Sequence, residues 1–138
     1  MHGSCASRDG QAVLLIGPPG AGKSDLILRL LGRGFDLVAD DQVEISGGIV
    51  SAPAALSGLL EVRGLGIVRL PHVASARLAL IADLGGAGDR LPLPARHAAL
   101  DVPIIHLIAS AASAPDRVIM ALDCALGRVN QIAGAFAP

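Results

Sequence analysis

The chain has 138 residues, of which 52% are hydrophobic and 17% charged, and its formal net charge is −1. This length and composition predict one folded globular domain over residues 1–138 with a hydrophobic core of its own. No basic stripe points to nucleic acid, and charges, glycines or prolines interrupt each apolar run well before the ~20 residues that cross a membrane.

The first half of the chain alternates apolar runs with glycine-rich turns. Residues 11–17 (QAVLLIG) predict a buried strand that ends in a glycine loop, and residues 24–31 (SDLILRLL) have the apolar period of a helix. Residues 35–39 predict the next strand. Two further runs, 43–45 and 49–51, flank the turn SGG and predict an antiparallel hairpin.

The second half continues with shorter apolar pieces. Residues 56–60 predict a short helical turn, and 61–70 (EVRGLGIVRL) hold two apolar pieces around a pair of glycines. Residues 77–84 and 104–110 predict strands, and the Gly/Pro-rich stretch 85–94 between them predicts a mobile loop. A strand–loop–helix–strand start, followed mostly by strands, predicts an α/β core with a mixed sheet.

A final helix is predicted to begin near residue 113. Ser113 is expected to cap it, Pro115 suits its first turn, and Asp116 stands at the capping-box position. Its expected apolar face consists of Val118, Ile119, Leu122, Ala125, Leu126 and Val129.

Residues 17–24 read GPPGAGKS and fit the P-loop pattern G-x-x-x-x-G-K-[ST] between a predicted strand and a predicted helix. Glycines let successive backbone amides surround phosphate oxygens, and the start of the helix adds its positive end. Lys23 would bring a point charge to the outer phosphates, and the Ser24 hydroxyl could bind Mg²⁺. The expected nucleotide-binding residues are Gly17, Pro18, Pro19, Gly20, Ala21, Gly22, Lys23 and Ser24.

Lys23 is the only lysine, since the other ten basic residues are arginines. A compact ammonium suits a phosphate cradle better than a planar guanidinium does, so its position strengthens the prediction of a phosphate site over that of a chance Gly/Pro turn.

Two adjacent aspartates, Asp40 and Asp41, follow the strand after the P-loop helix. Ligands of α/β sheets bind beyond the carboxyl ends of the strands, so Asp40 is expected to open onto the phosphate crevice. Phosphoryl transfer needs acidic residues for the metal shell and for the acceptor hydroxyl. An Asx turn joining two strands is the structural alternative.

The motifs GPPGAGKS, ADD and RGLGI, in this order, resemble the catalytic domain of HPr kinase/phosphorylase. The resemblance is strong over residues 1–70 and weaker through 100–107. It implies a P-loop core with a mixed β-sheet, similar to phosphoenolpyruvate carboxykinase. It also implies ATP and Mg²⁺ as cofactors, a serine of the HPr phosphocarrier protein as acceptor, and a hexamer.

The resemblance also implies residue roles. Asp40 resembles the catalytic aspartate, base in the kinase direction and acid in reverse, with Asp41 supporting it or the metal. Glu61 resembles the acid that holds Mg²⁺ together with Ser24, and Arg63 belongs to the signature linked to dephosphorylation. His2 resembles the histidine that begins the catalytic domain, with a frayed terminus as the alternative.

The chain also departs from the family pattern. It resembles a short form that consists of the catalytic domain only, so allosteric control is in doubt. Gln42 replaces an arginine often seen after ADD, and Arg117 is the one counterpart of a basic capping loop. These gaps concern phosphorolysis and partner binding, and leave the nucleotide cradle intact.

The sequence is also compatible with two other functions: a P-loop kinase for a small-molecule acceptor, and a nucleotide-binding regulatory module without catalysis. His72, His97 and His106 lack the spacing of metal ligands. Cys5 and Cys124 are too few for a disulfide framework and lack a CxxC spacing, which favours a cytoplasmic, reducing compartment. Both are expected to be small buried hydrophobes.

Overall fold

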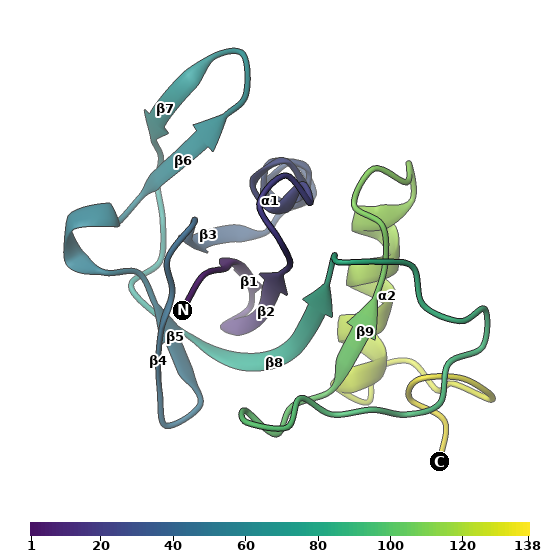
Figure 1. Ribbon diagram of the computed structural model, residues 1–138. Coiled ribbons are helices and arrows are strands. Elements are labelled where there is room, and N and C mark those ends of the chain that lie inside the picture. Colours follow the sequence, from purple (N-terminus) through teal and green to yellow (C-terminus); the bar gives the residue numbers. More distant parts are fainter.

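The computed structural model describes residues Met1–Pro138 as one sheet with two α-helices, a separate hairpin and a long C-terminal loop region (Figure 1). Neither helix is long and apolar enough to cross a membrane. In chain order the elements are β1 (Ser4–Arg8), β2 (Gln11–Ile16), α1 (Lys23–Leu31), β3 (Asp36–Ala39), β4 (Glu44–Ser46), β5 (Ile49–Ser51), a 3₁₀ turn (Ala54–Leu56), β6 (Leu59–Val62), β7 (Gly66–Arg69), β8 (Ala76–Asp83), β9 (Ile104–His106) and α2 (Ala114–Ala125).

The main sheet has seven strands in the order β3-β1-β2-β8-β5-β4, and β9 pairs with β8 beside β5. Strand β8 is parallel to β2 and β9, whereas β1 is antiparallel to both of its neighbours. The predicted α/β fold with a mixed sheet is therefore confirmed. Strands β6 and β7 form a separate antiparallel hairpin that projects from the body near α1 (Figure 1).

Both faces of the sheet are covered, as the pattern of β2 illustrates. Val13 and Leu15 belong to the larger core cluster, whereas Ala12 and Leu14 belong to the smaller one, and all four are fully buried. Alternate residues of a strand point to opposite faces, so a continuous apolar run produces two buried faces. The larger cluster also contains the buried faces of α1 and α2.

The strand directions gather several chain segments at one edge of the sheet. β3 and β2 are both antiparallel to β1, and β2 is parallel to β8, so β2, β3, β8 and β9 all run the same way. Their carboxyl ends meet at the edge where the loop 17–22 and the aspartate pair follow their strands. The start of β1 lies at the same edge, since Ser4 pairs with Leu15.

Most predicted elements are confirmed, with differences at their ends. Strand β1 was not predicted, because SCASR has no apolar alternation and becomes buried only by lying between two other strands. The helical turn lies at Ala54–Leu56 instead of 56–60, and β9 ends at His106 instead of residue 110.

The predicted capping of α2 is partly wrong. Pro115 does lie in the first turn, but the Ser113 side chain makes no capping hydrogen bond. The helix ends at Ala125, so Val129 lies beyond it and is 37% exposed. The chain after Gly127, which has a positive φ of 74°, turns back as a loop where the sequence pattern had predicted one more helical turn.

Candidate active site

The loop 17–22 between β2 and α1 has a backbone shape that requires glycine. Gly17, Gly20 and Gly22 have φ values of 148°, 83° and 96°. A Cβ on Gly22 would also lie 3.0 Å from the Cβ of Ala109, which precedes α2. No side chain caps the start of α1, so the first amide groups of the helix are free to meet an anion.

Lys23, the first residue of α1, folds over this loop. Its ammonium donates hydrogen bonds to the carbonyl oxygens of Gly17 (2.7 Å) and Pro18 (3.1 Å). Both acceptors are neutral, and no carboxylate lies within salt-bridge distance of the ammonium. The loop therefore presents a positive charge together with helix amides at one place, which is an arrangement that binds phosphate.

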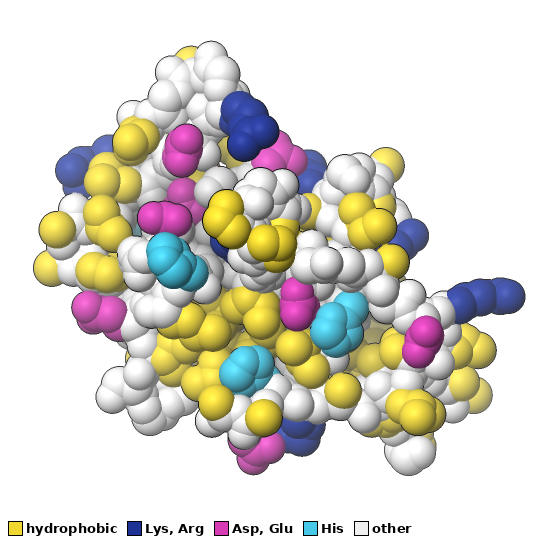
Figure 2. All heavy atoms as spheres, viewed as in Figure 1, with side chains coloured by type: hydrophobic (Ala, Val, Ile, Leu, Met, Phe, Trp, Pro, Cys, Tyr) yellow, Lys and Arg dark blue, Asp and Glu magenta, His cyan; other side chains and the backbone are white.

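A cavity of about 460 Å³ lies beside the loop, bounded by α1 and the β6–β7 hairpin. Figure 2 shows acidic and basic side chains gathered around the space between that hairpin and α1. Only two of its eleven lining residues are hydrophobic. The residues predicted for the site that line it are Pro19, Gly20, Gly22, Lys23, Ser24, Asp41, Glu61 and Arg63.

Asp40 lies behind the cavity wall, with 7% of its surface exposed. One carboxylate oxygen accepts hydrogen bonds from Ser4 Oγ and Ser24 Oγ, each at 2.7 Å. The other accepts a hydrogen bond from the backbone amide of Glu61 at 3.2 Å. Asp40 thus connects β1, α1 and β6, and three donors compensate its buried charge. None of the three lies near it in sequence, as a partner in an Asx turn would.

Asp41 occupies the position that was expected for Asp40. It is exposed and lines the cavity with Lys23 and Ser24. Its φ of 67° is left-handed, a conformation that aspartate tolerates better than most residues. Strand β3 ends at Ala39 and the backbone turns at Asp41. The two carboxylates therefore point in different directions: that of Asp40 into the protein and that of Asp41 toward the cavity.

The site offers oxygen atoms suited to a hard cation. Ser24, Asp41 and Glu61 line the same cavity with a hydroxyl and two carboxylates. No group of three or more His, Cys, Asp or Glu side chains is arranged as a complete metal site. These donors fit Mg²⁺, which is commonly held by one or two carboxylates together with phosphate oxygens and water.

His2 lies beside the site, where it pairs with Gln42, but it does not line the cavity. Its ring nitrogen Nδ1 lies 3.1 Å from the side-chain nitrogen of Gln42. The N-terminal residues are paired, since Gly3 N donates to Asp41 O and Val43 N donates to Met1 O. The alternative of a frayed terminus is therefore wrong, and the pairing brings His2 beside the aspartate pair.

Ser4 is a residue of this site that the sequence did not reveal. It is completely buried, and its hydroxyl donates to Asp40 and lies 3.4 Å from the backbone amide of Asp41. Serines are common, and no motif marks this one. Cys5 beside it is buried, as expected for a small hydrophobe, and burial raises the pKa of its thiol.

Comparison with known proteins identifies the family. The family model described as HPr serine kinase C-terminal domain matches residues 1–76. The chain belongs to this family. An HPr kinase/phosphorylase of Clostridium tetani is 47% identical to it over 77 residues, which are 53% of this chain and 25% of that protein. One of Listeria welshimeri is 47% identical over 75 residues, which are 51% of this chain and 24% of that protein.

The matched part of the chain thus spans about a quarter of the length of these relatives. A solved structure, the Hpr(Ser) kinase/phosphatase from Coxiella burnetii, superposes with a TM-score of 0.67. That superposition covers 88% of this chain and 86% of the other at 23% identity. The fold of the HPr kinase domain therefore extends well beyond residue 76.

Proposed function

We propose that the chain is an ATP- and Mg²⁺-dependent protein-serine kinase that phosphorylates the HPr phosphocarrier protein, with phosphorolysis as the reverse reaction. The proposal rests mainly on one observation: residues of the loop 17–22 line the same polar cavity as Ser24, Asp41, Glu61 and Arg63. Family membership and the names of the relatives support HPr as the acceptor.

Nucleotide binding is assigned to the loop 17–22 and to Lys23. The loop amides and the start of α1 would hold the phosphates of ATP, and the ammonium of Lys23 would neutralise their charge. The chain has no Trp or Tyr and two phenylalanines, so the adenine ring has few aromatic partners. Recognition in this site would therefore depend on the phosphates.

Mg²⁺ binding is assigned to Ser24 and Glu61. The Ser24 hydroxyl donates its hydrogen to Asp40, which leaves its oxygen lone pairs free for a cation. Asp40 also accepts a hydrogen bond from the backbone amide of Glu61. One buried carboxylate would therefore position both residues proposed to bind the metal. When bound, Mg²⁺ would screen the negative charge of the transferring phosphoryl group.

Proton transfer is assigned to Asp41, because it is the aspartate on the cavity wall. Asp41 would accept the proton of the attacking serine hydroxyl and return it to the serine oxygen in phosphorolysis. Arg63, on the opposite hairpin, would stabilise the negative charge on the phosphoryl oxygens. Asp40 then serves as a positioning residue.

The test mixes the purified protein with ATP·Mg²⁺ and HPr from the same organism, and mass spectrometry locates any added phosphate. We expect one phosphoserine on HPr, and none with the Lys23→Ala variant, whose fold is checked by circular dichroism. Unmodified HPr with the wild-type protein would refute HPr as the substrate. ATP binding by calorimetry would then show whether the nucleotide site survives and another acceptor should be sought.

A further inference from the structure

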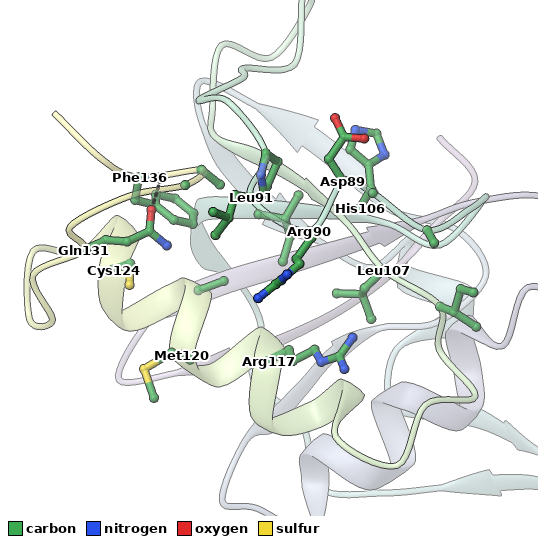
Figure 3. A pocket seen from close by; sticks show the side chains of 18 of the residues that line it. Asp89, Arg90, Leu91, His106, Leu107, Arg117, Met120, Cys124, Gln131 and Phe136 are labelled. Atoms are coloured by element: carbon green, nitrogen blue, oxygen red, sulfur yellow. Dashed lines mark hydrogen bonds between the residues drawn. The ribbon is translucent and has the colours of Figure 1, made fainter.

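A second cavity, of about 770 Å³, lies on the C-terminal side of the molecule. Its walls are the loop 87–92, the segment 105–111, one side of α2 and the C-terminal loop 131–136 (Figure 3). None of its lining residues belongs to the polar cavity at the phosphate loop.

Close contacts fix two of these walls. A Cβ on Gly88 would lie 3.2 Å from His106 Cβ and 3.3 Å from its carbonyl oxygen, so the loop lies directly against the chain at the end of β9. At the opposite wall, Phe136 N donates to Gln131 Oε1 at 2.6 Å. Gly134, with a φ of 118°, makes the tight turn between these two residues.

The interior of this cavity is mainly apolar. Twelve of its 21 lining residues are hydrophobic, and Leu91, Leu107, Met120 and Phe136 contribute large side chains. Met120 and Leu91 are 56% and 68% exposed, so much apolar surface here is open to solvent. A cavity of this volume and lining has the size and character of a small-molecule site.

Two arginines bring uncompensated positive charge to the cavity. Arg90 comes from the loop and Arg117 from α2, and Figure 3 shows both side chains extending toward the space between these walls. Neither guanidinium makes an ion pair or a hydrogen bond. The one acidic residue of the lining, Asp89, leaves a net charge of about +1 from these three residues.

Half of the chain's ten arginines form ion pairs. Five of them have a carboxylate within salt-bridge distance: Arg8, Arg29, Arg33, Arg96 and Arg128. Two unpaired guanidiniums beside an apolar surface therefore complement a ligand that has both an apolar body and an anionic end. Arginine binds carboxylate or phosphate oxygens in a bidentate manner.

We propose that this cavity binds a small amphiphilic anion, with its apolar body between Leu91, Met120 and Phe136 and its carboxylate or phosphate at Arg90 and Arg117. The site is separate from the proposed kinase site and does not depend on the proposed function.

The test uses the fluorescent dye anilinonaphthalene sulfonate, itself an apolar anion, as the probe of the cavity. Octanoate and octyl phosphate are then added as competitors, with octanol as the neutral competitor of equal chain length. We expect both anions to displace the dye at concentrations at least about tenfold lower than octanol does, a ratio equal to about 1.4 kcal/mol. The stronger of the two anions identifies the preferred end group. Equal displacement by octanol would overturn the proposal.

The variant Arg90→Gln/Arg117→Gln tests the location of the anion site. Its matched control, Arg69→Gln/Arg77→Gln, removes two positive charges outside the cavity and changes the net charge equally. We expect octanoate to bind about tenfold more weakly to the first variant, with no change in the control. Equal weakening in both would overturn the assignment. Light scattering measures self-association as a further check. If the protein self-associates and the associated form does not bind the dye, the cavity is an interface between two copies, and the proposal is overturned.

Discussion

The two cavities of this protein differ in how their residues are distributed along the chain. The polar cavity is lined by residues between 19 and 63, in motifs whose residue types suit the proposed binding of phosphate and metal. The apolar cavity uses residues 87–136, which lie in a loop, a helix side and a tail that carry no motif. The family model matches residues 1–76, so it covers the whole first cavity and none of the second.

The difference shows that a site with strict chemical requirements can be recognised in a sequence, whereas a cavity formed by packing cannot. The proposed phosphate loop needs glycines at positive φ and one ammonium, and few sequences satisfy both by chance. The apolar cavity needs only hydrophobic side chains and two arginines of suitable position, which many sequences could provide. Substitutions can test whether the two cavities are as separate as this comparison implies.

The largest effect is expected for Asp41→Asn. Asparagine keeps the size of the side chain and tolerates the left-handed backbone, but it cannot accept the serine proton. We expect the rate of HPr phosphorylation to fall by about 10³-fold with little change in ATP affinity. Rates are measured with radiolabelled ATP, and dye binding to the apolar cavity should stay unchanged. Wild-type activity in this variant would refute the proton-acceptor role.

Asp40→Asn should act on stability as well as activity. The amide would place a donor near Ser4 or Ser24, which now donate to the carboxylate, in a buried site. We expect the free energy of unfolding to fall by about 2–3 kcal/mol, measured by urea denaturation. Asp41→Asn is the matched comparison, since its side chain is exposed. Equal stability of the two variants would contradict the positioning role of Asp40.

Gly88→Val tests the wall of the apolar cavity. Valine at this position would meet His106 Cβ and its carbonyl oxygen, so the loop 87–92 must move away from β9. We expect affinity for anilinonaphthalene sulfonate to fall by about three- to tenfold, whereas ATP binding stays unchanged. Gly86→Val is the matched control, because a Cβ there has no atom within 4 Å. A parallel loss of ATP binding would show that the two cavities are coupled.

The smallest effect is expected for Arg33→Ala. Its guanidinium pairs with Asp116 and so connects α1 with α2, but both side chains are substantially exposed. We expect a loss of about 0.5 kcal/mol in the free energy of unfolding by urea denaturation. A loss above about 2 kcal/mol would show that this pair, and not the shared core, holds the two helices together.

The sequence by itself determined the glycine-rich loop 17–22, the mixed α/β sheet and most strands. These follow from local rules: glycine where φ must be positive, apolar runs where a strand is buried on two faces, and turn residues between them. Strand β1 escaped prediction because its residues become buried only through neighbours on both sides. The end of α2 was not predicted correctly, because the helical spacing of apolar residues continues past Ala125, the last residue of the helix.

Only the tertiary structure decided the placement of the two aspartates, one buried and one on the cavity wall. Both follow the same strand, and adjacent positions in a sequence give no sign of which side chain turns inward. The choice depends on Ser4, Ser24 and the amide of Glu61, which three other elements bring to Asp40. The apolar cavity likewise exists only once the loop, α2 and the tail meet. Side chains that are distant in sequence create such sites by packing, and packing is a property of the folded chain.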